Sequence, residues 1–158
     1  MARELITSWA DFQLAFDRLL NIASHKVLIY DEDLSSLKLE SPPRLAQLNR
    51  ILQNGKKESL QIAVRKGALV GTRHPKLLKL LTTYSHQAYL QQTPSELAHL
   101  RDSMIVVDGK HGLIRFERDM PRSKLLIDED DEIRPYLNRF NEIFAAGGEN
   151  ITSSTLGL

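Results

Sequence analysis

The chain has 158 residues, of which 42% are hydrophobic and 26% charged, and its formal net charge is +1. This length suffices for one packed core, and the composition excludes a wholly disordered chain. Because the sequence contains no cysteine, a disulfide framework, thiolate chemistry and cysteine-ligated metal sites are excluded. In a nearly neutral chain, any binding of phosphate or nucleic acid has to come from a local patch.

Apolar periodicity divides the chain into alternating helices and strands. In chain order, the expected elements are helix 9–24, strand 26–30, helix 42–54, strand 59–64, helix 75–81, strand 87–90, strand 103–108, strand 113–116, strand 124–127 and helix 133–144. This order predicts an α/β fold with a mixed β-sheet of about six to seven strands, flanked by helices on both faces. We expect residues 1–146 to form a single domain and residues 147–158 to be a disordered tail.

Capping residues indicate where several of these helices begin and end. Ser8 and Ser41 are typical N-caps, and the pair 54–55 (Asn-Gly) indicates a left-handed helix end. Residues 93–96 have the pattern of a capping box, and the acidic run 128–131 is expected to cap the last helix. The boundaries of the helices therefore follow from local chemistry as well as from periodicity.

No segment predicts a membrane protein. The first residues lack the apolar run of a signal peptide, and the apolar runs, such as 105–107, are too short to span a bilayer. We therefore expect a soluble, cytoplasmic protein without a membrane span.

One strand and its surroundings resemble a known family. The phospholipase D family places H-x-K-x4-D along a strand, and a G-S-x-N motif follows. Here the segment 103–109 is similar to the end of that strand, 109–112 is typical of a hairpin turn, and 113–116 is similar to the returning strand. From Lys26 to Ala146 the order of elements resembles a single phospholipase D-type half-domain. The resemblance implies that fold, and it also implies a homodimer, because family members with one half-domain often pair two copies.

Matching the motif residue by residue changes what the resemblance implies about activity. With Asp108 at the family's aspartate, Arg101 stands at the histidine and Ser103 at the lysine. The glycine, serine and asparagine of the second motif fall on Arg115, Phe116 and Arg118. In the family one histidine is the nucleophile, and a partner histidine protonates the leaving oxygen. Because arginine stays protonated and has no free lone pair, the match implies a catalytically inactive domain that acts as a binding or regulatory module.

Two alternatives stay open. A shift of two residues keeps strand parity and would place His99 as a nucleophile beside Arg101. A divergent phosphodiesterase would then use His99 or His111, with Asp108. The second alternative is a structural dimerisation domain, in which the aromatic stripe that begins at Trp9 covers a partner, although such a stripe more often belongs to the core.

Basic residues near strand ends form the candidate anion-binding site. Arginine suits bidentate contacts with phosphate, and ligands of open α/β sheets lie outside the carboxyl ends of parallel strands. The candidate residues are Arg101, Ser103, Asp108, Arg115, Arg118, Arg65, Lys66 and Arg73. The partner that they imply is a phosphate-containing or nucleic-acid ligand. The alternative is that these arginines pair with carboxylates such as Asp108 or Glu117.

Neither a cofactor nor a metal is expected. The histidines show no H-E-x-x-H or comparable zinc spacing, and the acidic runs 31–33 and 128–132 lack the spacing of a calcium loop. The sequence also contains no G-x-S-x-G, no G-x-G-x-x-G before a helix and no Walker loop. Hydrolase-elbow, dinucleotide and nucleoside-triphosphate sites are therefore disfavoured.

Overall fold

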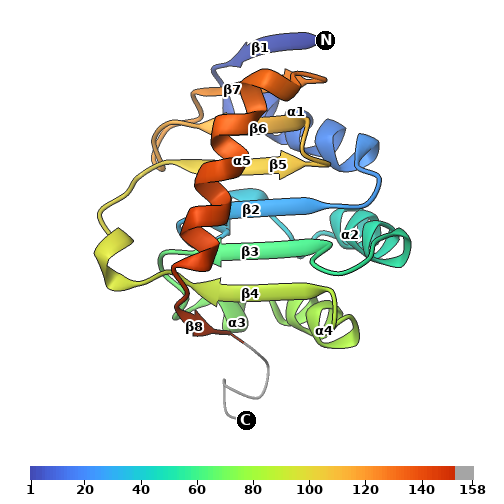
Figure 1. The fold of residues 1–158 in the computed structure, drawn as a ribbon, viewed down its shortest axis with the longest axis vertical. Helices are drawn as coiled ribbons and strands as arrows, with labels where there is room; N and C mark the ends of the chain where they lie inside the picture. The colour runs from blue at the N-terminus through green and yellow to red at the C-terminus, as the bar shows by residue number, and fades with distance from the viewer. Residues whose placement is uncertain (152–158) are drawn as a thin grey trace.

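The computed structural model describes residues 1–151, and its strands form one eight-stranded sheet in the order β1-β7-β6-β5-β2-β3-β4-β8 (Figure 1). The strands are β1 (Ala2–Ile6), β2 (Val27–Asp31), β3 (Leu60–Val64), β4 (Ala88–Gln92), β5 (Ser103–Val107), β6 (His111–Arg115), β7 (Ser123–Ile127) and β8 (Glu149–Asn150). The helices are α1 (Trp9–Ile22), α2 (Pro42–Asn54), α3 (Val70–Arg73), α4 (Pro75–Thr83) and α5 (Asp130–Ala145), with 3-10 turns η1 (Ser35–Leu37) and η2 (Ser95–Leu97).

The sheet is mixed and is covered on both faces. β2 pairs with β3, and β3 with β4, in parallel, whereas the other pairs among the described strands are antiparallel. Helices α1, α2 and α4 pack on one face, and α5 crosses the other (Figure 1). The predicted α/β fold, with a mixed sheet between helices, is therefore confirmed, and the sheet has more strands than expected.

Strand alternation divides the core between the two faces. Ile29 and Ile62 belong to the apolar cluster under α1, α2 and α4, whereas their neighbours Tyr30 and Ala63 belong to the cluster under α5. Every residue of β2, β3, β5 and β6 is buried, because both faces of the central strands are covered. Such strands read as continuous apolar runs, which is why the sequence reveals them.

The two outermost strands, β1 and β8, are not predicted from the sequence. Only Ile6 of β1 is buried, and both residues of β8 are exposed, so neither strand has an apolar pattern. Glu149 and Asn150 pair with β4. These two residues fall in the predicted tail 147–158, of which residues 152–158 lie outside the described residues.

The predicted helix caps are confirmed for the starts of α1 and α2 and are wrong elsewhere. Ser8 and Ser41 accept hydrogen bonds from the first turns of α1 and α2, as predicted. Gly55 is extended (φ −84°) rather than left-handed, and Glu58, three residues later, takes the positive φ instead. The capping box at 93–96 and the acidic cap of α5 are also wrong, because η2 and α5 begin without a side-chain capping hydrogen bond.

Candidate functional site

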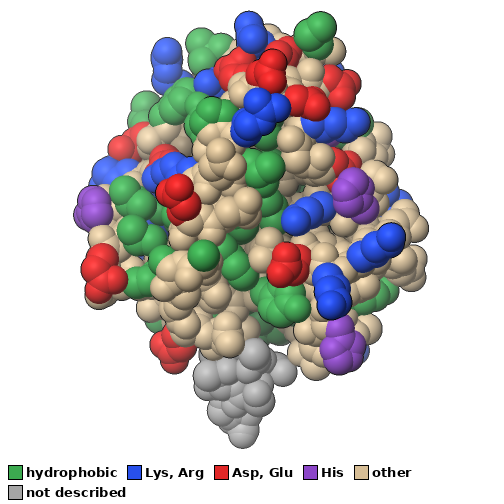
Figure 2. Space-filling model, in the orientation of Figure 1, with side chains coloured by type: hydrophobic (Ala, Val, Ile, Leu, Met, Phe, Trp, Pro, Cys, Tyr) green, Lys and Arg blue, Asp and Glu red, His purple; other side chains and the backbone are tan. Residues whose placement is uncertain are grey.

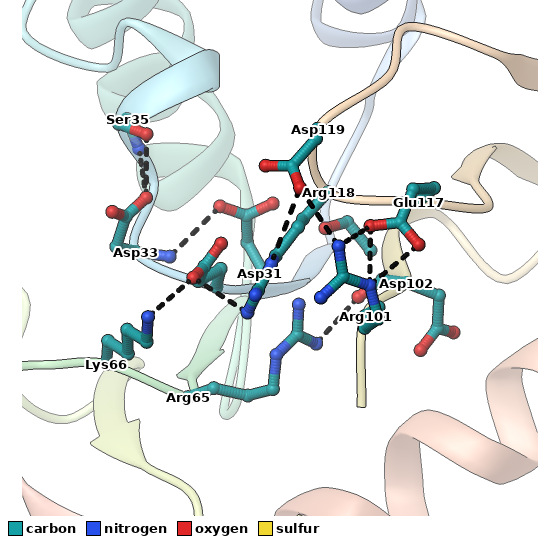
Figure 3. Close-up of polar contacts among 12 residues, drawn as sticks. Asp31, Asp33, Ser35, Arg65, Lys66, Arg101, Asp102, Glu117, Arg118 and Asp119 are labelled. Atoms are coloured by element: carbon teal, nitrogen blue, oxygen red, sulfur yellow. Dashed lines mark hydrogen bonds and ion pairs between the residues drawn. The ribbon is translucent and has the colours of Figure 1, made fainter. Parts of the chain in front are cut away.

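The carboxyl edge is the end of the sheet at which β2, β3 and β4 finish, β5 begins and β6 finishes, on the left of Figure 1. Asp31 ends β2, Arg65 follows β3, Ser103 opens β5 and Arg115 ends β6. Antiparallel pairing therefore brings residues from distant parts of the sequence to one place. Figure 3 shows acidic and basic side chains interleaved there.

A buried ion pair lies at the centre of the carboxyl edge. Arg115 Nη2 donates to Asp31 Oδ1 at 2.9 Å and to Ser103 Oγ at 3.3 Å. Both charged side chains are only 2% exposed. Asp31 Oδ2 in turn accepts the backbone N–H of Leu34 at 2.8 Å, which fixes the chain that leaves β2. Ser103 and Arg115 are thus brought together as predicted, but around a carboxylate.

Arg101, the residue matched to the family's histidine, lies just before β5 and not on it. Its exposed guanidinium binds the carboxylates of Glu117 and Asp119. The hydrogen bond between Arg101 and Glu117 raises the pKa of Arg101 and lowers the pKa of Glu117. Arg101 therefore occupies the histidine's place in the sequence match as one half of an exposed ion pair.

The cations beside β2 are also paired. Lys66 Nζ and Arg118 Nη1 both contact Glu32 Oε1, at 3.1 and 3.2 Å. Asp33 is partly buried, and burial alone would raise its pKa. Hydrogen bonds from Ser35 and the positive charges of Arg73 and Lys66 outweigh this effect, so the pKa of Asp33 is lowered.

Arg65 has two buried nitrogens without a hydrogen-bond partner among the described residues, whereas Arg115, the other buried arginine of the edge, has one, Nε. Arg65 is 5% exposed, and its Nη1 donates to the carbonyl of Asp102 at 2.7 Å. The two buried nitrogens are its Nε and Nη2. The guanidinium lies over the ring of Tyr30, 4.9 Å from the centroid, and burial raises the pKa of that tyrosine while Arg65 opposes the rise.

Two more buried polar groups without partners lie around Arg65. The backbone N–H of Thr93 donates to Val64 O, so Thr93 continues β4 beside Arg65 on the same face of the sheet. The hydroxyls of Thr93 and Tyr30 have no hydrogen-bond partner among residues 1–151. Arg139 of α5 forms an ion pair with Asp102 and completes this side of the edge.

Apart from Arg65, the residues of this group are not predicted from the sequence. Tyr30 is predicted only as part of strand 26–30 and Thr93 only as part of a capping box, and no role is predicted for Asp102 or Arg139. Strand parity offers a signal, because Tyr30 and Arg65 both project toward α5. The pairing of β4 with β3 and the position of α5, which place Thr93 and Arg139, have no local signature.

Asp108 and His111 lie at the opposite end of the sheet from Arg65, Arg101 and Arg115. The Asp108 carboxylate accepts three backbone N–H groups from residues 24–26, and it therefore ties the β5–β6 turn to the start of β2. His111 belongs to β6 and not to the turn, which corrects its expected position. Its buried Nδ1 accepts the N–H of Asp128 at 2.9 Å, and burial lowers its pKa.

The proposed shift in register does not place His99 on β5. His99 lies in an exposed turn after η2, four residues before the strand begins. Because neither His99 nor Arg101 lies in a strand, strand parity does not place the two side chains on the same face of the sheet. Arg73 is likewise exposed, and the N-terminus of α4 that follows it already binds the carboxylate of Glu40.

Positive and negative charges balance along the carboxyl edge. The basic side chains are Arg65, Lys66, Arg101, Arg115, Arg118 and Arg139, and the acidic ones are Asp31, Glu32, Asp33, Asp102, Glu117 and Asp119. A long polyanion gains little from such a surface. The arrangement favours recognition of a single anionic group by defined donors.

Residues 1–151 contain neither a cluster of metal-binding side chains nor a helix that could span a membrane. They contain no cluster of three or more His, Cys, Asp or Glu side chains that could hold a metal ion. Within the same range, no helix combines the length and apolar character required to cross a membrane.

Three solved structures share the fold. TrmBL2, an archaeal chromatin protein described as showing a novel mode of DNA binding, has a TM-score of 0.69 and 15% identity over 96% of this chain. Nuc from Salmonella typhimurium, a phospholipase D family member, has a TM-score of 0.63 and 10% identity over 96% of this chain. NucT from Helicobacter pylori has a TM-score of 0.57 and 11% identity over 92%.

These likenesses confirm the predicted phospholipase D-like fold and establish the fold alone. This chain spans 99% of Nuc and 96% of NucT, but only 55% of TrmBL2. A comparison with curated protein sequences gives no match. A family model described as "Domain of unknown function (DUF7931)" matches residues 9–152, nearly the whole sequence, and the chain belongs to that family.

Proposed function

We propose that this protein is a catalytically inactive relative of the phospholipase D fold that binds a phosphate-containing ligand at the carboxyl edge. The observation that carries the proposal is the buried guanidinium of Arg65 with its two unpartnered nitrogens, Nε and Nη2. These nitrogens lie on the same side of the guanidinium and together form the fork that binds two oxygens of one phosphate. Leaving such donors unpaired is costly, so a ligand that accepts from both gains the full benefit of pairing them.

The fork of Arg65 is held in place before any ligand arrives. Its third nitrogen is anchored on the carbonyl of Asp102, and its plane rests on the ring of Tyr30. The Thr93 hydroxyl, also without a partner among the described residues, stands beside it as a further donor. Leu97 and Leu100 of the β4–β5 connection pack against the apolar cluster on the same face of the sheet.

The absence of catalysis is proposed because of what occupies the motif positions. Arg101 is engaged by two carboxylates, and the Ser103 hydroxyl accepts from Arg115. Arginine has no free lone pair with which to attack phosphorus, and the Ser103 hydroxyl is hydrogen-bonded to Arg115, which cannot act as the general base that a serine nucleophile needs. Nucleic acid is the first class of phosphate ligand to test, because TrmBL2 shares the fold and is described as a DNA-binding chromatin protein.

Thermal unfolding in the presence of ligand tests the proposal. A ligand that binds only the folded state raises the unfolding temperature. We expect inorganic phosphate and a short 5′-phosphorylated oligonucleotide to raise it for the unaltered protein. Arg65→Met should remove this specific part of the rise, and Arg65→Lys should reduce it because a lysine keeps the charge without the fork.

Arg101→Met is the matched control, because it removes an exposed, already paired arginine from the same edge. Phosphate also stabilises proteins non-specifically, so only the difference between variants counts. An equal rise for the unaltered protein and Arg65→Met would contradict the proposal, and so would a loss of the rise in Arg101→Met alone.

A further inference from the structure

A second site lies beside the carboxyl edge, on the face of the sheet opposite α5. It is a pocket of about 290 Å³ between the first turns of α1 and the segment around η1, lined by Trp9, Ala10, Gln13, Ser36 and Lys38. The guanidinium of Arg115 lies 5.2 Å from the centre of the Trp9 ring, so the pocket adjoins the buried ion pair of the edge. None of its lining residues belongs to the Arg65 site.

Trp9 presents an aromatic surface to this pocket. Its side chain is held by Arg115 and by an edge-to-face contact with Phe12, with ring centroids 5.5 Å apart. Even so, Trp9 remains 38% exposed. A fixed and partly exposed indole is the kind of surface on which a nucleobase stacks.

The opposite wall is fixed by hydrogen bonds. Gln13 Nε2 donates to the Ser36 carbonyl at 2.8 Å, and Gln13 Oε1 accepts from Arg44 Nη1 at 2.6 Å. The same Arg44 nitrogen also donates to the Leu37 carbonyl at 2.7 Å. These contacts preform the pocket, and little ordering is left for a ligand to impose.

Lys38 gives the pocket an exposed positive charge. It is exposed and, among the described residues, has no ion pair, whereas Lys66, Arg101 and Arg118 are all paired with carboxylates. An unpaired ammonium beside an aromatic ring matches a planar base that carries a phosphate.

We infer that this pocket binds one unpaired nucleotide, with its base stacked on Trp9 and a phosphate against Lys38. The inference rests on the proposed function and narrows its ligand to a nucleotide unit of single-stranded nucleic acid. The volume admits a single base, and the bases of a duplex are not free to leave their stack without cost. The balance of charge along the edge fits recognition of one or a few nucleotides rather than a long tract.

The emission of Trp9 tests the inference directly, since Trp9 is the only tryptophan in the chain. We expect a short oligothymidylate to change this emission saturably, and inorganic phosphate and a duplex of the same length to leave it unchanged. Thymidine monophosphate should also change the emission but bind more weakly, because it lacks the rest of the strand. An equal affinity would identify a free nucleotide, and not a strand, as the ligand.

Two variants with matched controls measure the contributions to affinity, read from the anisotropy of a labelled oligonucleotide. Trp9→Ala should weaken binding about tenfold or more, in line with the loss of one stacked base. Its control is Leu14→Ala, which removes an exposed apolar side chain of the same helix outside the pocket and should leave the affinity unchanged. Lys38→Gln should weaken binding and flatten its salt dependence. Lys57→Gln, at the other end of the sheet, should do neither. If Trp9→Ala perturbs folding, Trp9→Phe replaces it, because it keeps an aromatic ring and should retain part of the affinity.

The two proposals fail in different ways. In one outcome, phosphate stabilises the protein through Arg65, the oligonucleotide leaves Trp9 emission unchanged, and the Trp9 and Lys38 variants bind it as tightly as the unaltered protein does. The inference is then overturned and the proposed function stands. If Trp9 responds and Lys38→Gln weakens binding while Arg65→Met has no effect, the pocket is confirmed and the Arg65 site is wrong.

Discussion

Asp31 and Arg115 show how a single buried contact determines the geometry of the edge. Each side chain is 2% exposed, and the carboxylate also holds the backbone of Leu34. Removing one partner of such a pair leaves a buried charge uncompensated, at a cost of about 3–5 kcal/mol. We expect Asp31→Asn to lower the free energy of unfolding by about 3 kcal/mol, measured by urea denaturation.

Glu117→Gln is the matched control for that experiment. It removes a partner of Arg101, but this pair is exposed and solvent screens it. Its loss of stability should be small beside that of Asp31→Asn. Equal losses in the two variants would show that burial does not strengthen the pair at Asp31.

His111 predicts how stability depends on pH. Burial lowers its pKa from the ordinary value of 6.5, and its Nδ1 accepts a hydrogen bond that requires the neutral ring. Below pH 6.5 the unfolded chain takes up a proton that the folded chain resists, so this contribution to stability is present above that pH and is lost as the pH falls. We expect the free energy of unfolding to fall more steeply in the unaltered protein than in His111→Asn, which keeps an acceptor but does not titrate. His99→Asn, at an exposed site, should keep the slope of the unaltered protein.

Among the elements, β8 depends on a backbone conformation that only glycine provides at low cost. Gly148 has φ +135°, and a Cβ there would lie 1.7 Å from the carbonyl oxygen of Gln92. Gly148→Ala should therefore separate β8 from β4. We expect amide hydrogen exchange to accelerate at Ile151, whose N–H donates to Leu90 O, together with a loss of stability.

Gly147→Ala is the control that separates the strain of a positive φ from the steric clash expected at Gly148. Gly147 also has a positive φ, of +85°, but a Cβ there meets nothing within 4 Å. Only the left-handed strain of about 1–2 kcal/mol remains, and the Ile151 amide should stay protected. Deprotection of Ile151 in both variants would mean that strain alone opens β8.

At the scale of the whole molecule, the two histidines of the phosphodiesterase alternative, His99 and His111, lie in separate parts of the fold. His25 contacts Asp108 and His111 contacts Asp128, both at the end of the sheet opposite the candidate site, and His99 lies in an exposed turn. We expect no histidine-dependent hydrolysis of bis(p-nitrophenyl) phosphate, assayed with His99→Ala and His111→Ala beside the unaltered protein. Turnover that disappears in His99→Ala would restore the enzymatic alternative.

The local pattern of apolar residues predicts most of the helices and strands, but few of the contacts at the candidate site. The strands found from the sequence, such as β2 and β5, are buried on both faces and read as apolar runs. By contrast, β1 is an edge strand with one buried residue, so its pairing with β7 leaves almost no trace in composition. The prediction that arginines gather at strand ends anticipated Arg65 and Arg115, but not that Asp31 would neutralise one and leave the other unpaired.

By itself, the sequence determined the order of strands β2 to β7 and of helices α1, α2, α4 and α5, together with the starts of α1 and α2, because periodicity and capping act within a few residues. It also predicted, from the resemblance to the phospholipase D motif, that Arg101 stands at the position of the motif's histidine. Tertiary structure alone decided which side chains meet. Asp31 and Arg115 are 84 residues apart in the chain, and strand direction sends Asp108 to the far end of the sheet. Contacts at such separations depend on the pairing of the whole sheet, which no short segment encodes.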